Sequence, residues 1–264
     1  MLCWDERSGS TAAVRSRLRG EPPVATGVIW ATEPGLRVPR HVASGLRSAA
    51  AVWALSSAQL DVLAGWGIRC TRLHHLVMGI DAGFWRPEPD VVADPELVLA
   101  VGNDRHRDHA AVVEAVAAVR RRRPARLVLV THHPVSVPTD LGERVPQCTH
   151  RELREHYARA AVVALALTQN LHLSGLTALL ESMACGKPVV VTRTPGIEHY
   201  VRDGETGVLV EPGPGALAVQ VERLLDDPDR AATLGAAARR EVTARLSTVH
   251  QASALAAILE TARR

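Results

Sequence analysis

Short runs of apolar residues alternate with segments of helical periodicity from about Leu97 to the end of the chain. Five apolar runs predict strands, at residues 97–102, 126–134, 161–168, 187–192 and 206–212. Helices are predicted between and after them, at residues 108–122, 150–160, 174–185, 216–225, 228–244 and 248–262. Strands that are apolar throughout and alternate with helices are typical of a parallel sheet with both faces covered. This region is therefore predicted to be a doubly wound α/β domain.

The region before Pro87 carries the same pattern more weakly. Two apolar runs predict buried strands, at residues 23–30 and 49–56, and a helix is predicted at residues 57–67. We interpret residues 2–9 as the end of a strand and the loop that follows it.

Residues 79–90 contain glycines, prolines and acids, and this composition is typical of a linker between domains. We therefore expect two Rossmann-like domains in an α/β chain. The amino-terminal one, over residues 1–86, is expected to be truncated, because a domain usually has about 100–150 residues. The carboxy-terminal one, over residues 87–264, is expected to be complete and to end in a helix that crosses back.

Composition excludes several classes of protein. The net charge of +3 is too small to indicate nucleic acid as a partner. The four cysteines lack the paired spacing of a zinc site or a disulfide framework, which fits a reducing compartment. No apolar run reaches the length of a membrane span, and the first residues lack the apolar core of a signal peptide. We therefore expect a cytoplasmic protein.

Four consecutive arginines, residues 120–123, end a predicted helix. Cations at that end of a helix complement its dipole, so we interpret the run as a surface feature. Peripheral contact with anionic lipid is the alternative.

A single carboxylate, Glu181, lies inside an otherwise apolar helix that follows the third predicted strand of the carboxy-terminal domain. Burying an unpaired carboxylate costs several kcal/mol or more, and the helix contains no basic residue to pair with it. A bound ribose would explain the acid, because its neighbouring hydroxyls can donate hydrogen bonds to a carboxylate. The alternative is structural, with Ser174 as the helix cap and Glu181 reaching solvent or a backbone amide.

The start of the same helix has the features of a phosphate site. In open parallel sheets, ligands lie at the carboxyl ends of strands, where the next helix begins. Ser174 and Gly175 would begin this helix and expose backbone N–H groups at the positive end of its dipole. Gly175 allows close approach of an anion, and Ser174 and Thr177 provide hydroxyls.

Six segments in order resemble motifs of one family. They are "VWALSSAQLDVLAGWGI", "GIDAGFWRP", "VGNDRHRDHAAVVEA", "LLESMACGKPVVVTRTPGIEHYV", "DGETGVLVEPG" and "LLDDPDRAATLGAAARREV". Together they resemble GT-B glycosyltransferases of the large retaining family, also called glycosyl transferases group 1. The resemblance extends from about residue 51 to residue 240 and implies a GT-B-like fold.

The resemblance implies roles for individual residues. In that family the glutamate that matches Glu181 holds the ribose of the donor. The loop before it, which contains His172, Ser174, Gly175 and Thr177, and basic residues after Gly102 hold the diphosphate. Arg107 matches one of those basic positions, and Arg105 is the candidate for the other, because Asn103 stands where the family usually has arginine. The family also commonly has an acid where Leu173 stands.

Histidines are frequent but do not form a recognisable metal motif. His132 and His133 end the second strand of the carboxy-terminal domain, where the resemblance places the base of the nucleotide. We expect backbone contacts with the base there. No metal and no cofactor are expected, and no catalytic residue is assigned.

The function that the resemblance implies is transfer of a sugar from a nucleotide-diphosphate sugar, with retention of configuration. The acceptor, whether a small molecule, a glycan or a lipid-linked group, is not identified by the sequence. Two alternatives stay open: a nucleotide-sugar-binding subunit that is inactive without a partner chain, and a nucleotide-sugar epimerase. Because the first domain is expected to be partial, we also expect exposed apolar surface, with self-association or a partner chain.

Overall fold

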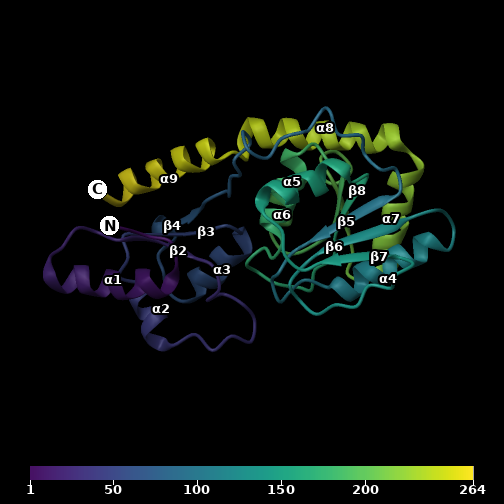
Figure 1. Cartoon of the computed structure of the whole chain (residues 1–264). Helices are drawn as coiled ribbons and strands as arrows, with labels where there is room; N and C mark the ends of the chain where they lie inside the picture. Colours follow the sequence, from purple (N-terminus) through teal and green to yellow (C-terminus); the bar gives the residue numbers. More distant parts are fainter. Residues whose placement is uncertain (264) are drawn as a thin grey trace. The chain divides into compact units, whose positions relative to one another are not determined.

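The computed structural model describes residues 1–263, whose contacts fall into two compact units (Figure 1). Unit 1 comprises Met1–Met78, Asn170–Leu173 and the carboxy-terminal segment that starts at Thr248. Unit 2 comprises Gly79–Gln169 and Ser174–Ser247. Each unit contains a parallel sheet with helices, so the α/β prediction is confirmed.

Unit 2 is built on a parallel sheet that has six strands within residues 1–263. Their spatial order is β10 (Val208–Val210), β9 (Val189–Thr192), β8 (Val162–Leu165), β5 (Leu97–Val101), β6 (Arg126–Val130) and β7 (Gly142–Val145). The chain runs outward from β5 to β7, returns to β8 beside β5, and runs outward again to β10. The strand order therefore reverses between β5 and β8, which is where doubly wound sheets bind their ligands.

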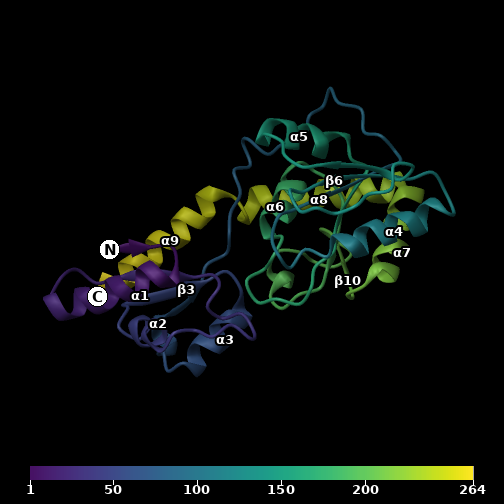
Figure 2. The same ribbon diagram turned by 60° about the horizontal axis from the view of Figure 1, so that its bottom comes forward.

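Helices cover both faces of this sheet (Figure 2). On one face, α4 (His109–Arg120) and α7 (Pro214–Asp226) pack through an apolar cluster that includes Val98, Val116 and Val221. The other face carries α5 (His150–Arg159) and α6 (Leu176–Ala184). The start of α5 is fixed by a capping box, in which Thr149 and Glu152 exchange hydrogen bonds.

The segment after residue 78 belongs to unit 2, so the expected domain boundary after residue 86 differs from the one in the structure. Arg239 on α8 (Pro228–Arg245) explains the difference. Its guanidinium donates hydrogen bonds to the carbonyl oxygens of Ala82 and Trp85, at 2.9 and 2.8 Å. Trp85 is buried and packs edge-to-face against Tyr157, with ring centroids 5.8 Å apart. These contacts fix the expected linker as part of the second unit.

Unit 1 contains a smaller parallel sheet, of four strands among the described residues. The strands follow chain order, as β1 (Leu2–Cys3), β2 (Ala25–Val28), β3 (Ala51–Ala54) and β4 (Leu73–His75). The helices α1 (Glu6–Arg19), α2 (Arg40–Leu46) and α3 (Ser57–Gly65) follow the first three strands in turn. Residues 2–9 thus form a strand end, a short turn and the start of α1, and Asp5 caps this helix by accepting two backbone N–H groups.

The last helix, α9 (Thr248–Arg263), belongs to unit 1, in agreement with the expected helix that crosses back, although the expected boundary counted it with the second domain. Leu255 and Ile258 of α9 form an apolar cluster with Trp53 and Leu76. Val249, in the first turn of α9, is 71% exposed. The helix therefore covers the sheet of unit 1 with its second half.

Large apolar side chains remain exposed in unit 1, as expected from its size. Trp4 is 55% exposed and Leu18 on α1 is 80% exposed. Self-association or a partner chain that would cover such residues stays a prediction.

Two of the four arginines at the end of α4 form ion pairs with α7. Arg122 contacts Glu222 at 2.5 Å and Arg123 contacts Asp226 at 2.7 Å. Both pairs are partly exposed, so each contributes about 0–1 kcal/mol. This agrees with their interpretation as a surface feature. Among the helices of residues 1–263, none has both the length and the apolarity that a bilayer crossing requires.

Candidate nucleotide-binding site

The loop after β5 is joined to the end of β8 by backbone hydrogen bonds. The N–H of Asp108 donates to the carbonyl oxygen of Ala166 at 3.0 Å, and the N–H of Thr168 donates to that of His106 at 2.9 Å. Arg107 lies between these bonds and pairs with Leu167 in an isolated antiparallel bridge. The two loops at the strand-order reversal therefore form one structure, and Arg107 is at its centre.

Two glycines leave the space that the side chain of Arg107 occupies. A Cβ atom on Gly102 would lie 2.3 Å from Arg107 Nε, and one on Gly175 would lie 2.7 Å from Nη1. Both distances are too short for real atoms, so neither position can carry a side chain while the guanidinium stays in place. Gly102 and Gly175, which the sequence singled out for backbone geometry, thus also form a cradle for Arg107.

The guanidinium of Arg107 is held in a poorly solvated place. Its Nε is buried and has no hydrogen-bond partner among residues 1–263. Burial lowers the pKa of Arg107 to about 10, while Tyr157, Asp104 and Glu181 act in the opposite direction. The group remains cationic at neutral pH. A half-buried cation with an unused donor is suited to an anionic ligand.

A Gly175→Ala substitution should therefore impair both the fold and anion binding. The residue has φ +88°, and an added methyl group would displace Arg107. We expect a loss of about 1–3 kcal/mol of stability from the backbone conformation, together with weaker binding of inorganic pyrophosphate. Gly213→Ala is the matched control, because Gly213 also has positive φ but has no atom within 4 Å of an added Cβ. Equal pyrophosphate binding by both variants would contradict the cradle.

The helix α6 starts at Leu176, one residue later than it would if Ser174 were its N-cap. Its N-cap is Gly175 and not Ser174, and no side chain caps it. The hydroxyl of Ser174 instead donates to Asp104 Oδ1 at 2.8 Å. The prediction that Ser174 caps the helix is wrong, because Asp104 competes for its hydroxyl. Thr177, in the first turn of α6, is exposed, so the helix presents its first N–H groups and one hydroxyl at the end that attracts anions.

Glu181 lies further along α6 and is only 6% exposed. Its Oε2 accepts a hydrogen bond from the phenol of Tyr157 at 2.9 Å. Burial raises the pKa of Glu181 to about 7, against the opposing effects of that bond and of Arg107. The protein partner of Glu181 is thus a phenol and not the backbone amide that the structural alternative named.

Tyr157 is a residue of this site that the sequence analysis did not identify. It lies on α5, is fully buried, and comes 24 residues before its partner. Burial raises the pKa of Tyr157 well above its usual value, so the phenol stays a hydrogen-bond donor. Leu153 lies four residues before Tyr157, and this helical spacing indicates a buried face of α5. The spacing alone does not show which acid would contact that face.

The remaining residues of the β5–α4 loop take other roles. Arg105 is exposed, and its Nε donates to the ring of His106 at 3.2 Å. Asn103 stands where the family that the sequence resembles usually has arginine. Its side-chain oxygen accepts a hydrogen bond from the backbone N–H of His132 at 2.8 Å. The carbonyl oxygen of Asn103 is 2.8 Å from the ring of His133. Asn103 therefore fixes the loop after β6, and the structure does not place Arg105 beside Arg107 in the cradle.

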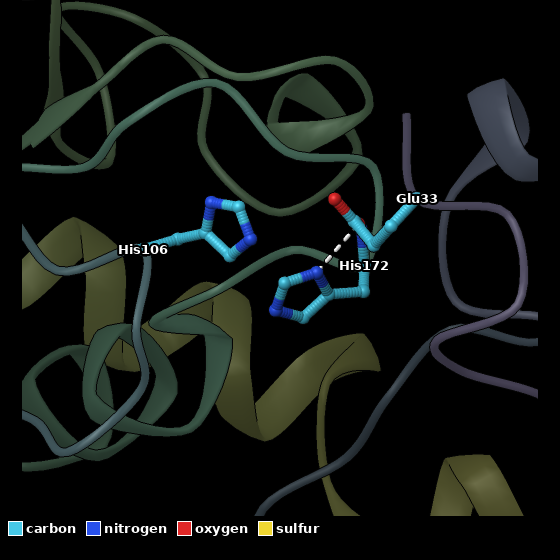
Figure 3. Close-up of side chains that lie close together, drawn as sticks. All are labelled: Glu33, His106 and His172. Atoms are coloured by element: carbon cyan, nitrogen blue, oxygen red, sulfur yellow. Dashed lines mark hydrogen bonds and ion pairs between the residues drawn. The ribbon is translucent and has the colours of Figure 1, made fainter. Parts of the chain in front are cut away.

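His172 lies in unit 1, not with the other predicted site residues. Its ring Nδ1 lies 2.5 Å from Glu33 Oε1, and Figure 3 shows these two side chains close together. The same oxygen accepts the backbone N–H groups of Leu171 and His172, at 2.8 and 2.7 Å. Trp30 covers the imidazole, with ring centroids 4.4 Å apart. Sequence reasoning missed Glu33, because nothing in its local sequence indicates a partner 139 residues away.

The two α/β units and the strand-order reversal define the class of protein as one with the GT-B fold. Solved structures of that class match almost the whole chain. Sucrose-phosphate synthase from Thermosynechococcus elongatus matches with a TM-score of 0.79 and 24% identity, over 98% of this chain and 73% of that one. Anabaena HepE, in complex with UDP and glucose, matches with a TM-score of 0.78 and 17% identity, over 98% and 78%.

The sequence profile of the family described as glycosyl transferases group 1 matches residues 95–227, which is half of the chain. The chain belongs to this family. D-inositol 3-phosphate glycosyltransferase of Thermomonospora curvata is 36% identical over 156 residues, covering 58% of this chain and 35% of the relative.

A second relative is the GDP-mannose-dependent alpha-(1-6)-phosphatidylinositol monomannoside mannosyltransferase of Mycolicibacterium smegmatis. It is 32% identical over 199 residues, covering 63% of this chain and 50% of the relative. The chain thus spans between a third and a half of the length of these two curated relatives.

Proposed function

We propose that the protein transfers a sugar from a nucleotide-diphosphate sugar to a hydroxyl-bearing acceptor. The observation that carries this proposal is the arrangement within unit 2 of a half-buried cation, a helix N-terminus and a buried carboxylate. Arg107 lies against Gly175, the N-cap of α6, and Glu181 lies on the same helix. A diphosphate needs the first two features and a ribose needs the third.

Each part has a defined role in the proposed reaction. The bond from the anomeric carbon of the sugar to the diphosphate oxygen breaks, and a bond from that carbon to the acceptor oxygen forms. The proton of the acceptor hydroxyl passes to the leaving diphosphate. Negative charge develops on the leaving diphosphate. Arg107 and the first N–H groups of α6 would stabilise it, since prepositioned donors in a poorly solvated site act most strongly on developing charge. Glu181 would hold the ribose. We propose retention of configuration, which the anomeric coupling in a proton NMR spectrum of the product tests.

The donor and acceptor are proposed only by class. One relative is named as dependent on GDP-mannose, and HepE was crystallised with UDP-glucose. UDP- and GDP-linked hexoses are therefore the first donors to test. Relatives named for inositol phosphate or phosphatidylinositol mannoside make polyols and their lipid-linked forms the first acceptors to test.

Nucleoside diphosphates should raise the melting temperature, because they bind the folded state. At a concentration 100 times the Kd, the stabilisation is about 2.7 kcal/mol, or roughly 5–10 °C for a chain of this size. A thermal-shift screen with UDP, GDP, ADP and dTDP measures it, and adenosine without phosphate is the control. The absence of a shift with all four diphosphates at several millimolar would contradict the proposed function.

A further inference from the structure

The two oxygens of the Glu181 carboxylate have different surroundings. Oε2 accepts the hydrogen bond from Tyr157 at 2.9 Å. Oε1 has no hydrogen-bond partner among residues 1–263, although the side chain is only slightly exposed. Oε1 is also not among the fully enclosed polar atoms of the described residues, so it is open to a donor from a ligand. The carboxylate therefore has a protein-facing oxygen and a ligand-facing oxygen.

The phenol that makes this distinction is itself rigidly held. Tyr157 is fully buried, and its ring packs edge-to-face on Trp85 at an interplanar angle of 88°. Trp85 is in turn fixed through its carbonyl oxygen by Arg239. The ring of Tyr157 is thus held by Trp85, and its hydroxyl also lies 3.3 Å from a second acceptor, the carbonyl oxygen of Ala178.

We propose that Tyr157 is a positioning residue for ribose recognition: by holding Oε2, it presents Oε1 of Glu181 to the ribose hydroxyls. This inference rests on the proposed function, because it assumes that a nucleotide occupies the site. Tyr157 does not touch the ligand, and it acts through the orientation and the ionisation of Glu181.

The charged and titratable groups around Glu181 come from several elements. Arg107 follows β5, Tyr157 lies on α5, Cys185 ends α6, and Cys148 precedes α5. Of these, the bond from Tyr157 and the charge of Arg107 lower the pKa of Glu181, whereas burial raises it. Without the phenol, the carboxylate should therefore hold its proton to a higher pH. A protonated Glu181 is a weaker acceptor for ribose hydroxyls.

Tyr157→Phe removes one oxygen and keeps the ring. Titration calorimetry with UDP and GDP, whichever binds wild type, should show about 10-fold weaker binding at pH 8. The reason is that a misplaced Glu181 loses one ribose hydrogen bond to a charged group, worth about 1.5 kcal/mol. The loss should grow as the pH falls to 6.5. Discrimination against the 2′- and 3′-deoxy analogues should shrink in the same variant. Tyr200→Phe is the matched control, since Tyr200 is equally buried, and it should bind like wild type.

The outcomes separate the inference from the function on which it rests. If wild type binds a nucleotide and folded Tyr157→Phe binds it equally well at both pH values, Tyr157 has no positioning role. An equal loss of affinity for the nucleotide and for its deoxy analogues would also overturn the inference, because a general structural defect does not depend on the ribose. If wild type binds neither nucleotide, the proposed function and the inference fail together.

Discussion

Arg107→Gln is expected to lower the turnover of a nucleotide sugar by about 100- to 1,000-fold. That is the usual effect of removing one prepositioned donor from a site where charge develops. The loss should appear in kcat more than in KM, because the guanidinium acts most strongly on the leaving diphosphate. The shorter glutamine also cannot fill the cradle between Gly102 and Gly175. The measurement is the steady-state rate of nucleoside diphosphate release at saturating acceptor. If no acceptor is known, the same release is measured as hydrolysis of the donor.

Arg126→Gln is the control for this prediction. Arg126 begins β6, at the amino end of the strand, and pairs with Asp94. Its loss removes an ion pair of little energetic value and should leave turnover within about 2-fold of wild type. If Arg107→Gln and Arg126→Gln retain the same turnover, the guanidinium in the cradle has no part in the chemistry.

Glu181→Gln is expected to weaken nucleotide binding by about 10- to 100-fold, because ribose hydroxyls lose a charged acceptor worth roughly 1.5–3 kcal/mol. The same substitution should stabilise the unliganded protein at alkaline pH. The folded-state pKa of Glu181 is raised from 4.5 to about 7, so its contribution to the free energy of unfolding is most favourable below pH 4.5. It loses stability as the pH rises through 7, by about 3 kcal/mol in total.

Glutamine cannot ionise, so it avoids that loss. At pH 8.5 the unliganded Glu181→Gln protein should unfold at higher denaturant concentration than wild type, with a gain of about 1–3 kcal/mol. Below the unfolded-state pKa, at pH 4, the two proteins should be nearly equal. Chemical denaturation at both pH values, together with titration of the nucleotide, measures the two effects. A variant that is less stable than wild type at pH 8.5, and binds nucleotide normally, would show that Glu181 is a structural residue.

The sequence predicted the elements of unit 2 well because most of its strands are buried on both faces. Such strands are apolar throughout, and their signal is strong. The exception is β7 (Gly142–Val145), an edge strand of the pattern Gly-Glu-Arg-Val that is only partly buried. Edge strands commonly carry charged residues, and the apolar signal is then lost.

The parts of the site that follow chain order were also predictable. Arg107 and Gly175 both follow strands, and the carboxyl ends of parallel strands meet at one edge of the sheet. Contacts that depend on packing were not predictable. Tyr157 meets Glu181 because α5 and α6 share a face of the sheet, and Asp104 withdraws Ser174 from the helix cap. The unit boundary was misplaced for the same reason, since Arg239 holds the expected linker from a distance of more than 150 residues.

The most direct test of the central claim is a crystal structure of the protein grown with UDP or GDP at several millimolar. The account predicts that the diphosphate oxygens lie within hydrogen-bond distance of Arg107 and of the first N–H groups of α6. It also predicts that the ribose hydroxyls lie on Oε1 of Glu181, while Tyr157 keeps its bond to Oε2. A nucleotide bound elsewhere on the protein, or bound with its ribose away from Glu181, would contradict the account.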